Sequence, residues 1–247
     1  MPKQIDQSGA HNYFDQQLVK NQNYKQQRRS MTASKKIVNV TITSDLMCPW
    51  CWVGLKKLQA ASKSSNIDTN ITWKPYFLRP NLPEDGVAKG GTPASRVGDR
   101  LRMVGERVGI KFTGLTDRTP NTTLFHATIR MLQDDNEIDS STVTKYHEAV
   151  FEGYFTLGVY PDQDGLLKAA KKLQTVDNDS RVFSKINSLF NDPHHLDQLK
   201  YEVHEEAKEE SYSGVSGVPS FQFNGNRAFS GAQDVETFET YLAHYAK

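Results

Sequence analysis

The stretch SDLMCPWCWVG, residues 44–54, contains both cysteines of this chain of 247 residues. The cysteines stand three positions apart, with a proline and a tryptophan between them. Two thiols at this spacing indicate redox chemistry where the pair opens a helix, whereas a metal site would need further ligands. The sequence on either side of the motif therefore decides how it is interpreted.

The residues before the motif predict a β-strand. Within residues 37–43, Val38, Val40 and Ile42 alternate with polar residues, which is the period of a strand with one buried face. β-Branched residues dominate this segment, as they do in strands. The predicted strand runs directly into the cysteine motif.

The residues after the motif predict an α-helix. Cys51, Leu55 and Leu58 recur at the spacing of one helical face. Pro49 suits the first turn of a helix, because a backbone N–H at that position has no partner within the helix. This places Cys48 at the helix N-terminus and Cys51 one turn inside.

These positions predict different roles for the two thiols. Unpaired N–H groups and the positive end of the helix dipole lower the pKa of a cysteine at a helix N-terminus below its free value of about 8.5. We expect Cys48 to be the thiol that reacts with substrates. We expect Cys51 to be less exposed, to keep a higher pKa and to resolve the mixed disulfide. Cys48 and Cys51 are therefore the candidate catalytic residues.

Two other interpretations of the motif are weaker. A structural zinc site needs four ligands, and the chain has neither a third cysteine nor two histidines at the His-x₃₋₅-His spacing. We therefore expect no metal. Two inert buried cysteines are the other alternative, but the strand-to-helix context and Pro49 favour a dithiol.

Composition argues against several classes of partner. The chain is 37% hydrophobic and 24% charged, with a formal net charge of +1, so nothing indicates a nucleic-acid partner. No run reaches the about 18 apolar residues of a membrane span, so we expect no membrane partner. Residues 1–36 are rich in Gln, Asn, Lys and Arg and predict a disordered leader on a cytoplasmic protein. A mitochondrial or plastid presequence is the alternative, which Asp6 and Asp15 disfavour because such peptides avoid acidic residues.

A second strand and a long helical segment follow the motif. Residues 70–77 predict a strand that Pro80 ends. Residues 79–213 predict an all-helical insertion, because a loop of that length is uncommon. Its helices are expected within residues 90–109, 119–136, 140–158, 162–174 and 192–210. In the first of these, Thr92 is the expected N-cap and Pro93 the first helical residue.

The alternation typical of strands returns after residue 214. Phe221 and Phe223 alternate with polar neighbours before the turn sequence NGN, which predicts a hairpin with strands 220–224 and 227–230. An amphipathic pattern then predicts a C-terminal helix.

Several motifs together resemble one known family. They are SDLMCPWCWVG, WKPYFLRPNLPEDG, PNTTLFHA, SGVSGVPSF and FSGAQ. The chain resembles the DsbA-like family, and its FrnE-type branch in particular, over nearly all of residues 37–246. The resemblance implies an α/β thioredoxin-like fold, with a mixed sheet and flanking helices. Residues 37–78 and 214–246 would form this fold, and the large all-helical insertion would interrupt it.

The resemblance also implies that the Val218–Pro219 peptide bond is cis and lies beside the cysteines. The backbone of Val218 would then be free to pair with an extended substrate, as in strand addition. A trans turn is the alternative, because only about 5% of X–Pro bonds are cis in folded proteins. Val218 and Pro219 are the candidate substrate-binding residues.

Four further residues are candidates for tuning the site. Asp45 precedes the motif and either tunes Cys48, relays a proton or caps the turn after the strand. Pro49 and Trp50 lie between the cysteines and shape the surface beside them. His126 either lines the groove between the two parts of the chain or is a core histidine at the start of a helix.

Three functions fit these observations. We predict a thiol–disulfide oxidoreductase that acts through Cys48 and Cys51 on protein or small-molecule thiols and disulfides. It would need no cofactor beyond its own disulfide, with glutathione as a candidate co-substrate. The second function is a glutathione-dependent transferase or isomerase of the same superfamily, whose members typically have Ser at the position of Cys48. The third is a non-catalytic or chaperone-like binding module, which would leave the dithiol without a use.

Overall fold

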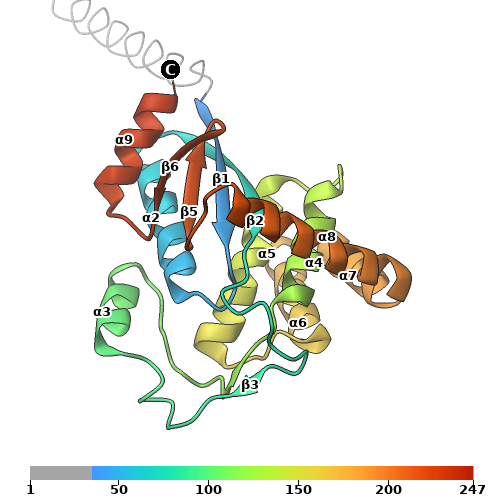
Figure 1. Cartoon of the computed structure of the whole chain (residues 1–247). Helices are drawn as coiled ribbons and strands as arrows, with labels where there is room; N and C mark the ends of the chain where they lie inside the picture. Colours follow the sequence, from blue (N-terminus) through green and yellow to red (C-terminus); the bar gives the residue numbers. More distant parts are fainter. Residues whose placement is uncertain (1–34, 247) are drawn as a thin grey trace, which may run out of the picture. The chain divides into compact units, whose positions relative to one another are not determined.

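A four-stranded mixed sheet lies at the centre of the part of the chain that the computed structural model describes, residues 35–246. The leader predicted for residues 1–36 falls almost entirely outside this range. The strand order is β2-β1-β5-β6 (Figure 1). β1 pairs in parallel with β2 and antiparallel with β5, which pairs antiparallel with β6. The strands are β1 (Ile37–Ser44), β2 (Asp68–Pro75), β5 (Ser220–Phe223) and β6 (Asn226–Ser230).

The cysteine motif lies where β1 passes into α2 (Pro49–Ser65). Cys48 is the N-cap, with extended backbone angles (φ −89°, ψ 106°), and Pro49 occupies the first turn. The helix ends at Asn66, whose left-handed φ of 54° lets its N–H bond to the carbonyl of Lys63. The predictions for the first strand and for this helix are confirmed.

The C-terminal segment returns to the sheet and closes the chain on α2. Asn224 and Gly225 both have positive φ, as a tight Asn-Gly hairpin turn requires. Asp234 then caps α9 (Val235–Tyr245) by accepting the N–H of Thr237 at 2.8 Å. α9 packs along α2. We call β1, α2, β2, β5, β6 and α9 the frame.

The segment between β2 and β5 is mainly helical, and we call residues 79–213 the insertion. Three of its helices, α4, α5 and α8, pack against β2 (Figure 1). Two short strands, β3 (Val87–Ala88) and β4 (Arg118–Thr119), pair within it, so it is not helical throughout. Its helices are α3 (Asp99–Arg107), α4 (Thr123–Asp134), α5 (Ser140–Glu152) with a π-helical turn at Gly153–Leu157, α6 (Gln163–Asp177), α7 (Arg181–Phe190) and α8 (Pro193–Tyr212).

One helix boundary predicted from the sequence is wrong. Thr92 does not begin a helix, because its segment forms an isolated turn in which the Ser95 side chain accepts the N–H of Thr92 at 2.9 Å. The helix begins instead at Asp99, after Gly98 as N-cap. Ser and Thr side chains that bond to nearby backbone compete with helix formation, which explains the difference.

The frame and the insertion share one hydrophobic core. Leu55 of α2 and Phe221 of β5 are fully buried in the same cluster as Phe125 of α4 and Tyr146 of α5. A side chain of the insertion also covers the open edge of the sheet at β2. Gln133 accepts the N–H of Trp73 at 2.6 Å and donates to its carbonyl at 3.0 Å. No helix within residues 35–246 is both long and apolar enough to cross a membrane.

Candidate active site

The two cysteines lie at the junction of β1 and α2, and both thiols are free in this structure. Cys48 is 6% exposed, whereas Cys51 is completely buried. The Cys48 Sγ donates a hydrogen bond to the carbonyl oxygen of Val218 at 3.6 Å. The Cys48 N–H donates to the carbonyl of Asp45 at 3.0 Å, which holds the residue in place at the helix tip.

The pKa values of the two thiols are shifted in opposite directions. The Cys51 thiol forms a hydrogen bond with the Cys48 sulfur, and this hydrogen bond is the main reason that the pKa of Cys48 is lowered. The backbone N–H groups of Cys51 and Trp50 lower it further, while burial and the charge of Asp45 act against them. Complete burial raises the pKa of Cys51 well above its ordinary value, and the bond to Cys48 adds to this rise. The pKa of Cys48 is thus lower than that of Cys51, as the sequence predicts. The hydrogen bond from the Cys51 thiol, however, lowers the pKa of Cys48 more than the helix N–H groups do.

Val218 and Pro219 lie beside Cys48, and the bond between them is cis, as the resemblance implied. Val218 is half-buried and Pro219 is buried. Strand β5 begins only at Ser220, so the backbone of Val218 lies outside the paired part of the sheet.

Gly54 of α2 lets this helix pack closely against Pro219 and Phe221, and the sequence analysis did not identify this residue. A Cβ added to Gly54 would lie 3.2 Å from Pro219 Cγ and 3.1 Å from Phe221 Cζ. Both distances are shorter than ordinary van der Waals contact. A glycine inside a predicted helix, three residues after Cys51, was the available signal.

Asp45 is completely buried, and it connects three segments around the cysteines. Its Oδ1 accepts the N–H of Met47 at 3.2 Å and the hydroxyl of Thr122 at 2.9 Å. Its Oδ2 accepts the N–H of Leu78 at 2.8 Å. The carboxylate thus caps the turn after β1, and its charge raises the pKa of Cys48. Asp45 therefore fits the capping interpretation, and its charge also affects the pKa of Cys48.

His126 is a buried histidine at the start of α4 and does not line the cavity beside Cys48. Its Nε2 lies 3.9 Å from Asp45 Oδ1 and has no hydrogen-bond partner among residues 35–246. The ring packs edge-on against Phe77, with 5.0 Å between ring centroids. His126 is thus a core histidine at a helix start, and it also lines a small cavity between β2 and the helices of the insertion, so both sequence interpretations hold in part. Within residues 35–246, no three His, Cys, Asp or Glu side chains are grouped so as to hold a metal ion.

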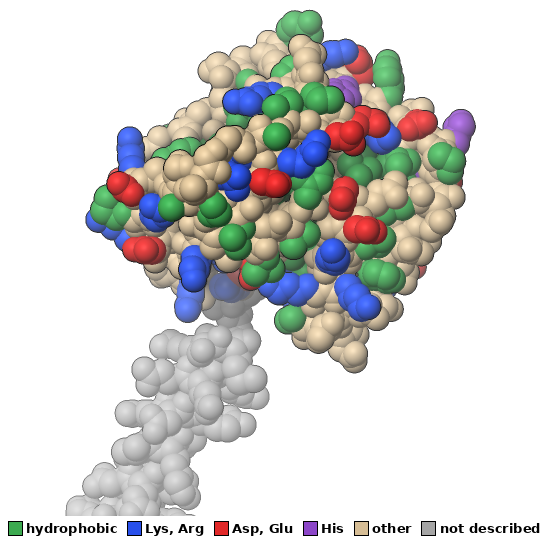
Figure 2. All heavy atoms as spheres, turned by 90° about the horizontal axis from the view of Figure 1, so that it is seen from below, with side chains coloured by type: hydrophobic (Ala, Val, Ile, Leu, Met, Phe, Trp, Pro, Cys, Tyr) green, Lys and Arg blue, Asp and Glu red, His purple; other side chains and the backbone are tan. Residues whose placement is uncertain are grey.

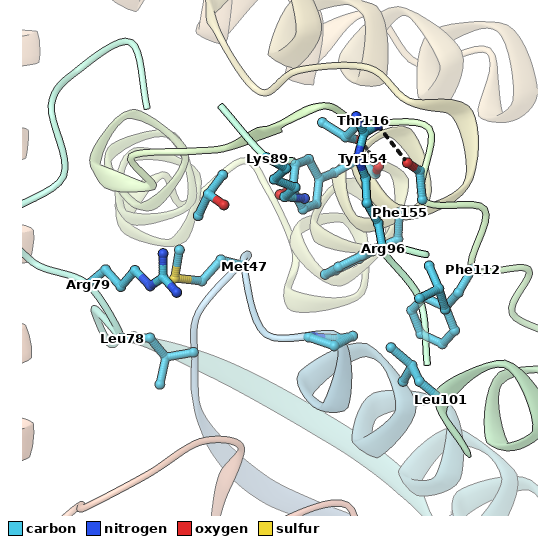
Figure 3. A pocket seen from close by; sticks show the side chains of 14 residues that line it. Met47, Leu78, Arg79, Lys89, Arg96, Leu101, Phe112, Thr116, Tyr154 and Phe155 are labelled. Carbon is cyan, nitrogen blue, oxygen red and sulfur yellow. Dashed lines mark hydrogen bonds between the residues drawn. The ribbon is translucent and has the colours of Figure 1, made fainter. Parts of the chain in front are cut away.

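A cavity of about 480 Å³ opens beside the motif and is lined by Met47 and Pro49, the two neighbours of Cys48. Its floor is apolar and includes Phe112 and Phe155 of the insertion (Figure 3). Trp50 is half-buried, and the guanidinium of an exposed arginine, Arg100, lies 5.7 Å from its ring centroid. Figure 2 views the molecule from the end where β1 enters the motif, and basic, acidic and hydrophobic side chains are interspersed across this face.

Comparison with known families gives one match, which covers most of the chain. The model of the DSBA-like thioredoxin domain matches residues 39–243. No curated protein matches the sequence. The family match confirms the resemblance to DsbA-like proteins, while its FrnE-type branch stays a prediction.

Solved structures share the fold at low sequence identity. A probable DsbA oxidoreductase from Streptomyces coelicolor is 21% identical, with a TM-score of 0.66 over 84% of this chain and 89% of that one. A putative protein disulfide isomerase from Nitrosomonas europaea is 13% identical, with a TM-score of 0.57 over 85% and 98%. The cytosolic disulfide reductase DsbM from Pseudomonas aeruginosa, solved with GSH, is 12% identical, with a TM-score of 0.53 over 84% and 95%. The predicted thioredoxin-like fold class is confirmed.

Proposed function

This chain belongs to the family of DSBA-like thioredoxin domains, and we propose that it is a thiol–disulfide oxidoreductase acting through Cys48 and Cys51. The observation that carries the proposal is the unequal pair of thiols. Cys48 is 6% exposed and has a lowered pKa, while Cys51 is completely buried, has a raised pKa and is hydrogen-bonded to the Cys48 sulfur. The thiolate is the nucleophile in disulfide exchange, so this environment favours Cys48 as the attacking group.

The first step in the reducing direction forms a mixed disulfide on Cys48. Its thiolate attacks one sulfur of the substrate disulfide, a new S–S bond forms, and the substrate S–S bond breaks. The other half of the substrate leaves as a thiolate. In the second step Cys51 loses its proton and attacks the Cys48 sulfur, releasing the remaining substrate thiolate. The substrate gains two electrons and the enzyme dithiol loses two, so the reverse sequence oxidises substrate dithiols.

The backbone around Val218 and Pro219 is the proposed contact for the substrate. The Val218 carbonyl lies 3.6 Å from the Cys48 sulfur and outside the paired sheet. An extended substrate can therefore pair with this backbone while its sulfur faces Cys48. We propose protein or small-molecule thiols and disulfides as the substrates. The structural similarity to a disulfide reductase solved with GSH supports glutathione as a co-substrate.

The test is to trap the mixed disulfide. Cys51→Ala should accumulate covalent adducts on Cys48 when it is mixed with disulfide-bonded insulin or with glutathione disulfide, because the resolving thiol is absent. Cys48→Ala should form no adduct and should lose turnover by a factor on the order of 10³ or more. Mass analysis after non-reducing electrophoresis measures both. Turnover by Cys48→Ala, or alkylation of Cys51 before Cys48 at pH 6, would contradict the assigned roles.

A glutathione-dependent isomerase is the second candidate, because one solved structure of similar fold is a 2-hydroxychromene-2-carboxylate isomerase. That structure is 14% identical, with a TM-score of 0.56. Isomerisation that persists in Cys48→Ala, without disulfide reduction by the wild type, would favour this second function.

A further inference from the structure

Three basic side chains line the cavity beside Cys48, and none of its lining residues is acidic. The three are Arg79, which lies in the irregular segment before β3, and Lys89 and Arg96, which lie in the irregular segment between β3 and α3 (Figure 3). In Figure 3, Arg79 lies alongside Met47, the residue before Cys48, and Lys89 lies beside Tyr154. The positive charges therefore line the same cavity as the two sequence neighbours of Cys48.

Neutral groups hold two of these cations in place. Lys89 Nζ donates to the hydroxyl of Tyr154 at 2.7 Å and lies 4.7 Å from the centroid of its ring. Arg96 donates to the carbonyl of Gly114 at 3.2 Å and to the carbonyl of Gly90 at 3.3 Å. These contacts fix the side chains without cancelling their charge.

In the described part of the chain, the three cations are not paired with carboxylates. Neither Arg79, Lys89 nor Arg96 forms an ion pair with another residue in the range 35–246. Burial lowers the pKa of Lys89, and the nearby charge of Arg96 lowers it further, against a weaker opposing effect of Asp117. Like charges held this close, in a partly buried cavity, favour an anionic ligand.

The cavity also has the size and lining of a small-molecule site. Its volume of about 480 Å³ lies within the range of ligand pockets, roughly 300–1,000 Å³. Leu101 and Phe112 supply apolar surface in the same cavity. A substrate whose sulfur reaches Cys48 can place the rest of its chain along this surface, with an anionic end at the cations.

We propose that this cavity selects small disulfides and thiols that carry a carboxylate a few bonds from the sulfur. The proposal rests on the oxidoreductase function proposed above and names its substrate class. In the reaction, the Cys48 thiolate attacks the disulfide of the bound acid, a mixed disulfide forms, and a carboxylate-bearing thiolate leaves. Arg79, Lys89 and Arg96 act as specificity-determining residues, which bind the carboxylates without touching the sulfurs.

The test uses three disulfides of similar size and different charge. They are 3,3′-dithiodipropionate (anionic), bis(2-hydroxyethyl) disulfide (neutral) and cystamine (cationic). The measured quantity is kcat/KM for each probe, with KM and kcat separated. Each variant is compared with wild type on the same probe, which cancels differences in the leaving-group pKa between probes, whereas a change in the reactivity of Cys48 would affect all three probes alike.

The variants are Arg79→Gln, Lys89→Gln and the double variant, and Arg79→Lys tests rescue of the charge. Lys171→Gln, in α6 and outside the cavity lining, is the matched control. The double variant should lose about tenfold in kcat/KM for dithiodipropionate, mainly through KM, which corresponds to about 1.4 kcal/mol. The neutral probe should be unchanged, cystamine should be unchanged or faster, and Arg79→Lys should recover most of the loss. Added salt should raise KM for the anionic probe alone.

Two results would overturn the proposed substrate class, and both can be distinguished from a result that overturns the oxidoreductase function. Equal losses for all three probes would show that the cations act on the fold or on Cys48 rather than on the ligand. Insulin reduction faster than any small probe, and insensitive to the variants, would overturn the substrate class. If wild type reacts with none of the probes and does not reduce insulin, the oxidoreductase function itself is wrong.

Discussion

The frame and the insertion contribute different groups to the same proposed site. The frame carries both sulfurs, together with the backbone of Val218 beside Cys48. The insertion carries all three cations that line the cavity. The pKa of Cys48 is lowered mainly by its hydrogen bond with the Cys51 thiol, and the pKa of Cys51 is raised mainly by burial, whereas the cavity needs segments far apart in sequence. Reactivity and selectivity should therefore be separable by mutation, provided that the two parts remain packed together.

The largest expected effect comes from breaking the contact between the two parts. Trp52 of α2 is 4% exposed and is enclosed by three aromatic rings of the insertion. Its ring centroid lies 5.9 Å from that of Phe112, 6.0 Å from Phe151 and 6.2 Å from Phe155. Trp52→Ala should lower the free energy of unfolding by about 3–5 kcal/mol, because it leaves a large cavity in the shared core.

Urea denaturation followed by fluorescence and by circular dichroism measures this loss. Because the core is continuous, the two probes should give one coincident transition in wild type. Trp52→Phe, which keeps an aromatic ring, is the control and should lose less. Two separate transitions in wild type would show that the frame and the insertion unfold independently.

A second variant separates charge from packing inside the frame. Asp45→Asn removes the charge that raises the pKa of Cys48, so this pKa should fall further. The new NH₂ group would face one of the backbone or hydroxyl donors that Asp45 now accepts, so stability should fall by about 1–3 kcal/mol. Titration of thiolate absorbance measures the pKa, and urea denaturation measures the stability.

Thr122→Val is the matched control for this variant. It removes one hydrogen bond to Asp45 and keeps the carboxylate charge. It should lose stability while leaving the pKa of Cys48 close to that of wild type. A Cys48 titration that is the same in Asp45→Asn and in wild type would show that Asp45 acts on structure alone.

A buried histidine gives the insertion a pH dependence of its own. His147 is 1% exposed and stacks on Trp73 with 3.7 Å between ring centroids. Burial lowers its pKa well below the ordinary value, and the charge of His126 adds to this shift. Below a pH of about 6.5 the unfolded chain therefore binds a proton that the folded chain does not, so stability falls as pH falls, by up to about 1.4 kcal/mol per unit.

His147→Phe should reduce this slope, because a ring without a titratable nitrogen fills the same space, while His204, whose pKa burial also lowers, keeps a smaller slope. The measurement is the free energy of unfolding from urea curves between pH 5 and 7. His195→Gln, at an exposed position of α8, should keep the wild-type slope. An unchanged slope in His147→Phe would assign the acid sensitivity to another group.

Local sequence signals predicted the frame well. The alternation in β1, Pro49 in the first turn of α2 and the Asn-Gly turn at residue 224 each act over a few residues, and each element lies where expected. Strand β2 was placed two residues late, because its register is set by pairing with β1 rather than by its own pattern. The position of the two cysteines at the helix tip also lies where the sequence predicted it.

Much of the insertion could not be predicted from local patterns. Helix α7 was missed, because its apolar residues Val182, Ile186 and Leu189 are interpreted as a helical face only once a packing partner is known. The cations of the cavity lie in irregular segments without periodicity, so nothing in the sequence brings Arg79 and Lys89 together. Asp45 and His126 were each identified as candidates, but the sequence could not predict that their side chains lie 3.9 Å apart, because only the folded chain brings them together.

The smallest expected effect is at Gly54, where α2 approaches Pro219 and Phe221. An alanine there gains roughly 0.5–1 kcal/mol of helix stability over glycine. Against this, its Cβ would lie 3.1 Å from Phe221 Cζ and 3.2 Å from Pro219 Cγ, and overpacking of this kind costs about 1–3 kcal/mol. Gly54→Ala should therefore destabilise the protein by about 1 kcal/mol.

Gly153→Ala is the control. A methyl group there would lie 3.8 Å from Val159 Cβ, and the residue already has a helical φ of −51°, so stability should rise slightly. Urea denaturation of both variants decides the point: if Gly54→Ala gained as much stability as Gly153→Ala, α2 would have room to move away from Pro219, and the close packing would not be what positions Pro219 beside the cysteines.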